Sequence, residues 1–167
     1  MTSQSQTHCF REPESADLDW MVALNKRFEV EMSPMDRSEL EEILEQAVYR
    51  SVPVEAPAGF LIAIAPGAAY QSPNYRWFSD RYDAFVYVDR IVTDPAFQGR
   101  GIARGLYEDL FSRTAELGLK RICCEVNVDP PNPGSDAFHA AMGFQVVGEA
   151  ELPGGKKRVR YFVREVA

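Results

Sequence analysis

The most constraining feature of this sequence is a strand–turn–helix–strand pattern between residues 84 and 128. Residues 84–93 read AFVYVDRIVT and residues 121–128 read RICCEVNV, two segments rich in β-branched and aromatic residues. Between them, residues 102–117 carry apolar residues at helical spacing, and Gly118 follows where a helix commonly ends. Two strands joined by a crossover helix almost always form a right-handed unit. The pattern therefore predicts an α/β fold in which the two strands pair in parallel.

Further elements are predicted on both sides of this unit from periodicity and turn signals. Ser15 is a candidate N-cap for one helix, and a capping-box pattern at Ser38 and Glu41 marks the start of another. The predicted elements outside the central unit are helices over 15–31 and 38–48, a strand over 59–65, an aromatic-rich loop over 66–83, a helix over 135–142 and a hairpin of 145–152 with 158–166. Because the C-terminal hairpin is antiparallel, we expect a mixed central sheet flanked by helices, an α/β (α+β) architecture.

Length and composition limit the classes of protein to which the chain can belong. With 167 residues, 46% of them hydrophobic and 26% charged, residues 1–167 are expected to form a single domain, with residues 1–10 as a flexible tail. The formal net charge of −7 disfavours nucleic-acid binding, which depends on Lys and Arg neutralising phosphates. No apolar run is long enough for a membrane span and no signal peptide is evident, so a cytoplasmic location is expected.

Three cysteines are present, and their spacing does not suggest a site. Cys123 and Cys124 are adjacent and lack the C-x-x-C spacing of zinc or redox motifs, while Cys9 stands alone. We interpret the adjacent pair as small apolar residues filling a buried strand. The sequence therefore predicts no metal site.

The turn that precedes the central helix is rich in glycine and arginine. It reads Gln98-Gly99-Arg100-Gly101-Ile102-Ala103-Arg104. Glycines let the backbone approach a ligand closely, and the N–H groups of a first helical turn can hold an anion. The turn therefore predicts a phosphate or pyrophosphate site, with an ordinary strand–helix turn as the alternative. It lacks the Gly-Lys-Ser/Thr of a Walker loop, and Arg104 stands where the dinucleotide fingerprint needs Gly or Ala.

The segment 98–103 resembles the pyrophosphate loop Q/R-x-x-G-x-G/A of the GNAT acetyltransferase superfamily. Residues 91–95, Ile-Val-Thr-Asp-Pro, are similar to the strand before that loop, and Asn132 through Gly143-Phe144 resembles the motif N-x-x-A-x-x-x-Y-x-x-x-G-F. The similarity covers roughly residues 84–150. It implies a GNAT-like single domain with acetyl-CoA as co-substrate, no metal, an amine-bearing acceptor and a homodimer, which is common in that superfamily.

The resemblance also implies roles for individual positions. The backbone of Ile91 and Val92 would pair with the pantetheine arm, the amides of 99–103 would hold the pyrophosphate, and Asn132 and Phe138 would line the acyl end. The implied cofactor-binding residues are Ile91, Val92, Gln98, Gly99, Arg100, Gly101, Ile102, Ala103, Arg104, Asn132 and Phe138.

Acetyl transfer requires a deprotonated amine and a proton for the leaving thiolate. Glu125 aligns with the general base of the similar ribosomal-protein N-terminal acetyltransferases, and Asp89 is a second candidate. His139 stands where the family commonly has a tyrosine acid. An imidazole can protonate a thiolate only when it is charged, so Tyr87 and Tyr161 are alternative acids.

The acceptor site of this superfamily is built from the first helices, the loop that follows them and the terminal hairpin. The matching candidates here are Trp20, Asn25, Tyr75 and Trp77. A small amine, an amino acid or a peptide N-terminus would each suit them. The predicted function is therefore an N-acetyltransferase that works by direct attack in a ternary complex. The alternative is a non-catalytic acetyl-CoA sensor, which the histidine at position 139 keeps open.

Overall fold

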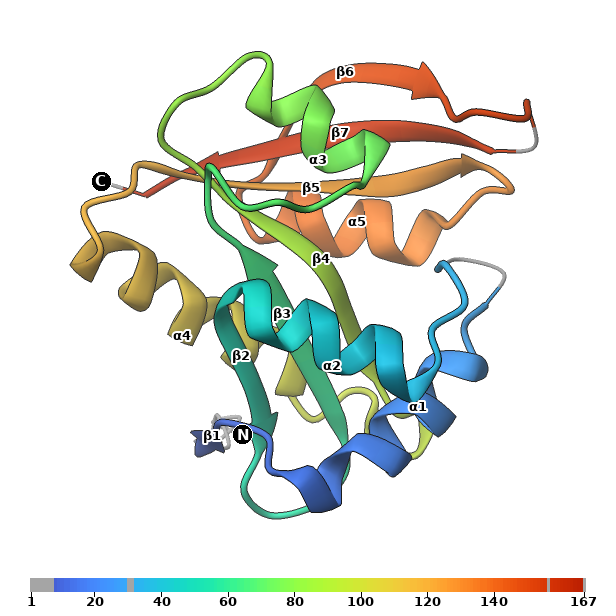
Figure 1. The fold of residues 1–167 in the computed structure, drawn as a ribbon, viewed down its shortest axis with the longest axis vertical. Helices are drawn as coiled ribbons and strands as arrows, with labels where there is room; N and C mark the ends of the chain where they lie inside the picture. Colours follow the sequence, from blue (N-terminus) through green and yellow to red (C-terminus); the bar gives the residue numbers. More distant parts are fainter. Residues whose placement is uncertain (1–7, 30–31, 156, 167) are drawn as a thin grey trace, which may run out of the picture.

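The computed structural model describes residues 8–29, 32–155 and 157–166, and these residues form one mixed sheet of seven strands (Figure 1). The strand order across the sheet is β1-β2-β3-β4-β5-β7-β6. The strands are β1 (Phe10–Arg11), β2 (Ala47–Pro53), β3 (Gly59–Ile64), β4 (Val86–Thr93), β5 (Arg121–Asp129), β6 (Gln145–Glu151) and β7 (Arg158–Glu165). Only β4 and β5 pair in parallel among these described strands. The predicted mixed sheet and terminal hairpin are confirmed.

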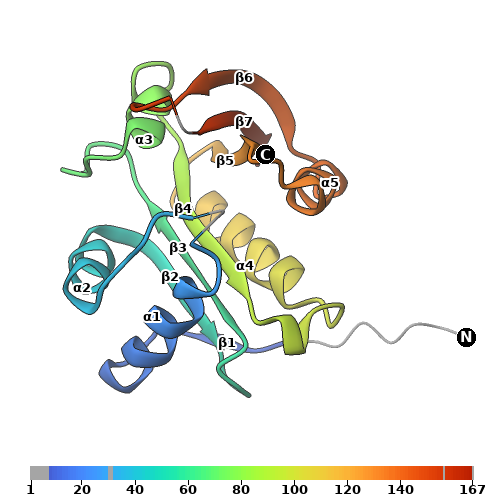
Figure 2. The same ribbon diagram turned by 90° about the vertical axis from the view of Figure 1, so that its right-hand side faces the viewer.

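Helices cover both faces of the sheet. They are α1 (Leu18–Lys26), α2 (Arg37–Gln46), α3 (Pro73–Ser79), α4 (Ile102–Glu116) and α5 (Pro133–Ala141), with short 3-10 turns η1 (Ser15–Asp17) and η2 (Pro95–Phe97). Helices α1 and α2 lie on one side of β2–β4, and α4 lies on the other side (Figure 2). No helix within the described ranges is long and apolar enough to cross a membrane.

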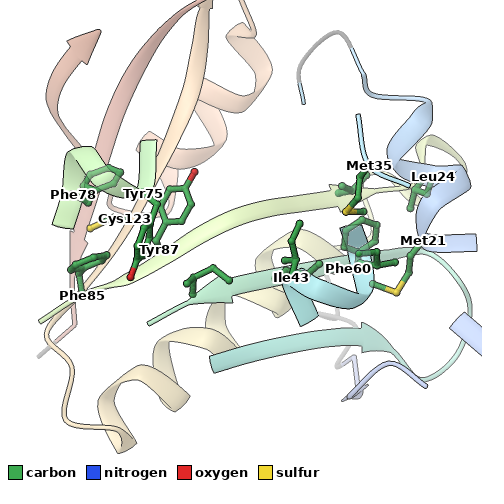
Figure 3. Packing of buried hydrophobic residues seen from close by; sticks show 14 of the residues in the cluster. Met21, Leu24, Met35, Ile43, Phe60, Tyr75, Phe78, Phe85, Tyr87 and Cys123 are labelled. Carbon is green, nitrogen blue, oxygen red and sulfur yellow. The ribbon is translucent and has the colours of Figure 1, made fainter. Parts of the chain in front are cut away.

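Alternation along the strands divides the core between the two faces. On β3, Phe60 and Ile62 pack with α1 and α2, whereas Leu61 and Ala63 pack with α4. The first of these clusters continues into an aromatic group under α3, where Tyr75, Phe78, Phe85 and Tyr87 gather near Cys123 (Figure 3). Cys123 and Cys124 are both buried, Cys123 in the first of these clusters and Cys124 in the second. This confirms that both are small apolar residues of a buried strand.

Strands β4 and β5 pair with each other over only a short length. Their parallel partners are Val86 with Ile122 and Tyr87 with Cys123. Beyond these residues β4 continues on β3 and β5 continues on β7, so the two strands diverge (Figure 1). The sheet is therefore split into two halves that share one short seam.

The start of α2 and its end differ from the prediction. The capping box uses Asp36 and Glu39, not Ser38 and Glu41: the Asp36 carboxylate accepts from the Glu39 amide at 2.8 Å. The helix ends at Gln46, and residues 47–48, which were predicted to continue it, begin β2. Pairing of 47–51 with β3 stabilises the extended backbone there.

Three other segments also differ. The first helix is shorter than 15–31, because α1 ends at Lys26; residues 30–31 lie outside the described ranges. The predicted loop 66–83 contains α3, whose N-cap is Ser72 with Pro73 following it. In the predicted tail, residues 1–7 lie outside the described ranges, but Phe10 forms β1 with Arg11 and pairs with β2. Pairing with β2 therefore decided the strand at Phe10–Arg11, whereas the start of α3 follows from its local N-cap.

Candidate active site

The divergence of β4 and β5 opens a cleft of about 1070 Å³ between the two halves of the sheet. That volume is enough for a large organic ligand. Both strands contribute their separated edges, and the walls come from α2, α4, α5, the segment before α3 and the hairpin. The β4 and β5 residues along the cleft are Tyr87, Val88, Asp89, Arg90, Ile91, Val92, Thr93, Cys124, Glu125, Val126 and Asn127.

The glycine-rich turn lies at the N-terminus of α4, beside this cleft. Gly101 is the N-cap of α4 and has a φ of 79°, a left-handed conformation that favours glycine. No described side chain caps the helix, which leaves the N–H groups of its first turn as donors for a ligand. The helix dipole places partial positive charge at this point. The turn therefore has the geometry of the predicted anion site.

The structure brings most of the predicted cofactor-binding residues to one edge of the cleft. Those lining it are Ile91, Val92, Gln98, Ala103, Asn132 and Phe138. The others, which form the adjoining turn without lining the cleft, are Gly99, Arg100, Gly101, Ile102 and Arg104. Asn132 also caps α5, since its Oδ1 accepts from the Ser135 amide at 3.4 Å. Its side-chain oxygen is thus held by its own helix.

Glu125 lies in the cleft wall where β5 leaves β4. The Tyr87 hydroxyl is 2.8 Å from Glu125 Oε2 and 2.9 Å from Oε1, and Asn74 Nδ2 donates to Oε1 at 3.0 Å. Burial raises the pKa of Glu125 to about 8, and the nearby charge of Asp89 acts in the same direction. The hydrogen bonds from Tyr87 and Asn74 oppose this rise. A carboxyl group with such a pKa can gain and lose a proton near neutral pH.

Asp89, the second candidate base, is already engaged. It is the extra residue of a β-bulge, because Ala63 and Ile62 on β3 face Val88 and Arg90 on β4. Its carboxylate accepts from Arg90 Nε at 2.7 Å and from the Tyr70 hydroxyl. Both side chains of the Asp89–Arg90 ion pair are more than 90% buried, so breaking the pair would leave an uncompensated charge. Glu125 is therefore the better placed base.

His139 has both ring nitrogens bonded within the protein. Nδ1 is 2.8 Å from the Ser135 carbonyl oxygen, which can only accept, so Nδ1 carries the hydrogen. Nε2 then accepts from the Tyr107 hydroxyl, 2.6 Å away. Burial lowers the pKa of His139, which keeps the ring neutral. The geometry argues against the predicted role of His139 as general acid, because a neutral ring with this bonding has no proton to offer the cleft.

The two alternative acids, Tyr87 and Tyr161, also form hydrogen bonds with neighbouring side chains. The Tyr87 hydroxyl bonds Glu125, and the Tyr161 hydroxyl donates to Asn74 Oδ1 at 2.9 Å. Burial raises the pKa of both tyrosines, to about 12 for Tyr161. Their hydroxyls therefore orient other side chains.

None of the four predicted acceptor residues lines the cleft in the described part of the chain. Trp20 donates its indole N–H to Asp17, and buried Asn25 bonds Arg90 and the Ser33 carbonyl. Tyr75 donates to the Ala65 carbonyl at 2.6 Å, and the Trp77 ring stacks on Tyr161 with centroids 4.1 Å apart. All four make structural contacts. On the side of α2 and the hairpin, the cleft is lined instead by Phe28, Met32, Ser33, Glu39, Glu42, Ile43, Gln46, Tyr70, Leu152 and Lys157.

Asn74 is the residue of this site that the sequence reasoning missed. The local signal was present, since Ser72-Pro73 is a typical N-cap followed by proline at the first helical position. That signal predicts a helix, but not that its second residue reaches Glu125, which is 51 positions away. Among the described residues, no group of three or more His, Cys, Asp or Glu side chains is arranged to hold a metal ion.

Several solved structures have the same fold. The chain is similar to Ard1 from Thermoplasma volcanium, with a TM-score of 0.78, 13% identity and coverage of 97% of this chain and 99% of that one. It is similar to the ribosomal-protein-S18-alanine N-acetyltransferase from Escherichia coli, with a TM-score of 0.70, 15% identity and coverage of 96% and 94%. Arabidopsis thaliana NAA60, solved with a bisubstrate analogue, has a TM-score of 0.74, 18% identity and coverage of 95% and 98%. At these identities the likeness concerns the fold.

A comparison of sequences points the same way. No curated protein matches the chain in a sequence search. Residues 56–144, more than half of the chain, match the family described as acetyltransferase (GNAT) family. This range includes β4, the glycine-rich turn, α4, β5 and α5, which together build one side of the cleft. The chain belongs to the GNAT family of acetyltransferases.

Proposed function

We propose that this protein is an N-acetyltransferase that moves the acetyl group of acetyl-CoA directly to a primary amine, with Glu125 as general base. One observation carries the proposal: the partly buried Glu125 carboxyl lines the cleft where β4 and β5 separate, and its pKa is raised to about 8. A general base works best when its pKa is near the working pH.

The residues along β4 and α4 support binding of acetyl-CoA. The open N–H groups at the start of α4 would hold the pyrophosphate, with Arg100 and Arg104 adding positive charge. Ile91 and Val92 would pair with the pantetheine arm through their backbone, since among the described strands β4 pairs with β5 only at Val86 and Tyr87. Phe138 would add an apolar wall. Bound in this way, acetyl-CoA supplies an activated acyl group beside Glu125.

Glu125 would prepare the acceptor by taking a proton from its ammonium group, directly or through a water molecule. The amine nitrogen then attacks the thioester carbonyl carbon; a C–N bond forms and the C–S bond breaks. The nitrogen gives up its second proton to solvent, the released thiolate takes one proton from solvent, and Glu125 returns its proton to solvent. A free thiol has a pKa of only ~8.5, so its thiolate leaves without a strong acid. This fits a site in which His139 and Tyr161 both bond protein groups.

The acceptor would enter on the side of α2 and the hairpin. That wall combines apolar side chains such as Phe28 and Ile43 with the carboxylates of Glu39 and Glu42. Carboxylates attract an ammonium group, so a small amine, an amino acid or a peptide N-terminus each fits the proposal. The family resemblance also implies a homodimer, which sedimentation of the purified chain would test.

Thermal unfolding with acetyl-CoA or CoA, followed by thiol release with a panel of amines, amino acids and peptides, tests the function. Stabilisation by acetyl-CoA together with thiol release on one class of amine is the expected result. Stabilisation without release on any acceptor would instead favour a non-catalytic acetyl-CoA sensor. Absence of stabilisation by either form of CoA would contradict the assignment of the turn at 98–104.

A further inference from the structure

Helix α3, inserted between β3 and β4, is packed firmly on the C-terminal hairpin. The Trp77 ring stacks on Tyr161, and Phe78 is fully buried with its ring 5.2 Å from the same tyrosine. A Cβ atom added to Gly148 of β6 would lie 2.7 Å from the Trp77 ring, so the helix and β6 are in close contact. The Arg81 guanidinium lies over the Trp77 ring, 3.8 Å from its centroid. The helix therefore has a defined position relative to β5 and β7.

Asn74, in the first turn of α3, bridges Glu125 and Tyr161. Its Nδ2 donates to Glu125 Oε1 at 3.0 Å, and its Oδ1 accepts from the Tyr161 hydroxyl at 2.9 Å. The residue is only 8% exposed. Ser72 holds this turn, since its Oγ accepts from the Tyr75 amide at 3.3 Å. The Asn74 side chain thus bridges side chains of the paired strands β5 and β7, at the level where Glu125 faces Tyr161.

The two bonds of Asn74 define which end of its amide faces Glu125. With the Tyr161 hydroxyl donating to Oδ1, the NH2 group points to the carboxyl group. An ionised carboxylate only accepts hydrogen bonds, so an NH2 donor favours the ionised form. Tyr87 supplies a second donor from β4. The carboxyl group is therefore held between donors from two elements that are far apart in the sequence.

We propose that Asn74 is a positioning residue for the base: oriented by Tyr161, it holds the Glu125 carboxyl group in the cleft wall and stabilises its ionised form. This inference rests on the proposed function, because it assigns a partner to the residue that would take the proton. It also gives the inserted helix a role, since α3 is the element that brings Asn74 to Glu125.

Other titratable groups around Glu125 set the background for this effect. They are Tyr87 and Asp89 on β4, Tyr161 on β7, Tyr70 before α3, Tyr107 on α4 and Cys124 on β5. The charge of Asp89 raises the pKa of Glu125, whereas the bonds from Tyr87 and Asn74 lower it. Loss of the Asn74 donor should therefore raise this pKa further. Activity would then need a higher pH to appear.

The test is the pH profile of kcat/KM in the thiol-release assay for four variants beside the wild type. Asn74→Ala should move the acid limb upward by about one pH unit, so that kcat/KM falls about tenfold at pH 7 and recovers at high pH. Tyr161→Phe keeps the aromatic ring on Trp77 but removes the hydroxyl that orients the Asn74 amide. It should move the acid limb upward by less than Asn74→Ala does. Arg76→Ala is the matched control on α3, because the Arg76 side chain is exposed and donates to Gln71, away from Glu125. Glu125→Gln should have no acid limb in this range.

The outcomes that would overturn the positioning role of Asn74 differ from the outcome that would refute the proposed base. If Asn74→Ala lowers kcat/KM by one factor at every pH, Asn74 has only a structural role. If Asn74→Ala fails to fold, Tyr161→Phe decides, and an unmoved acid limb in that variant overturns the proposal. Wild-type turnover in Glu125→Gln would instead refute the proposed base itself. If Glu125→Gln is inactive but the acid limb does not move in Asn74→Ala, only the positioning role of Asn74 is refuted.

Discussion

Two parts of the same cleft are built in opposite ways. The anion-binding turn takes its residues from one continuous stretch, 98–104, and offers mainly backbone N–H groups. The pocket around Glu125 takes side chains from four separate elements, with Asn74, Tyr87 and Tyr161 as the neighbours. A site made of backbone groups is visible in the sequence as a motif. A site made of side chains from distant elements is not.

The two parts also differ in how they interact with water. Gly99, Arg100 and Gly101 are exposed, and their positions depend on local backbone conformation. Glu125 is partly buried and hydrogen-bonded to Tyr87 and Asn74, and burial is the largest influence on its pKa. Changes in the turn should therefore alter affinity for acetyl-CoA, whereas changes in the pocket should alter turnover and its pH dependence. The predictions below test this difference, starting with the largest expected effect.

Glu125→Gln should lower kcat at least about 100-fold, because an amide cannot accept the proton of the acceptor and general bases contribute about 10²–10⁴-fold. The Kd for acetyl-CoA should change little, since Glu125 lies away from the turn that would hold the pyrophosphate. Steady-state kinetics together with calorimetric titration of acetyl-CoA would measure both. Equal losses in kcat and in acetyl-CoA affinity would contradict the separation of the two regions.

The raised pKa of Glu125 predicts a pH dependence of folding stability. The folded protein keeps this proton up to a pH of about 8, whereas the unfolded chain releases it near 4.5. The wild-type free energy of unfolding should therefore fall as pH rises from about 4.5 to 8 and level off above that. Glu125→Gln removes this contribution. Urea unfolding of both proteins across this range should therefore show the wild type losing stability relative to Glu125→Gln as the pH rises. A constant difference would contradict the raised pKa.

Tyr107→Phe should reduce stability by about 1–3 kcal/mol, because it leaves buried His139 Nε2 without its donor. Turnover should change by less than about threefold at saturating substrate, an amount worth under ~1 kcal/mol. Denaturant unfolding and kcat measured on the same preparation provide the comparison. A 100-fold loss of kcat with unchanged stability would restore His139 as a candidate acid, with Tyr107 as its hydrogen-bond partner.

Gly101→Ala should weaken acetyl-CoA binding about tenfold, because an alanine at a φ of 79° is strained by about 1–2 kcal/mol and the turn would shift to relieve it. Gly118→Ala is the matched control, since Gly118 has a φ of 74° just beyond the other end of α4. Both variants should lose about 1 kcal/mol of stability, but only the first should raise the Kd for acetyl-CoA. An equal rise of Kd in both would show that the turn has no special role.

Local patterns were sufficient for much of the fold. Helix α4 lies at 102–116 against a prediction of 102–117, and β5 lies at 121–129 against 121–128. The prediction failed at 47–48, where helical periodicity continues into a segment that pairs with β3. The segment 66–83, predicted as a loop, contains α3, and its Trp77 ring packs on Tyr161. In both places a partner distant in the sequence decided the structure.

The sequence by itself determined the strand–turn–helix–strand unit, the glycine-rich turn and the hairpin, because these depend on residues that are close along the chain. Only the tertiary structure decided that Asn74 meets Glu125 and that Tyr107 satisfies His139, since the members of each pair are 51 and 32 positions apart. Hydrogen bonding and burial control whether such groups hold a proton. The chemistry of the cleft therefore depends on contacts that no local pattern encodes.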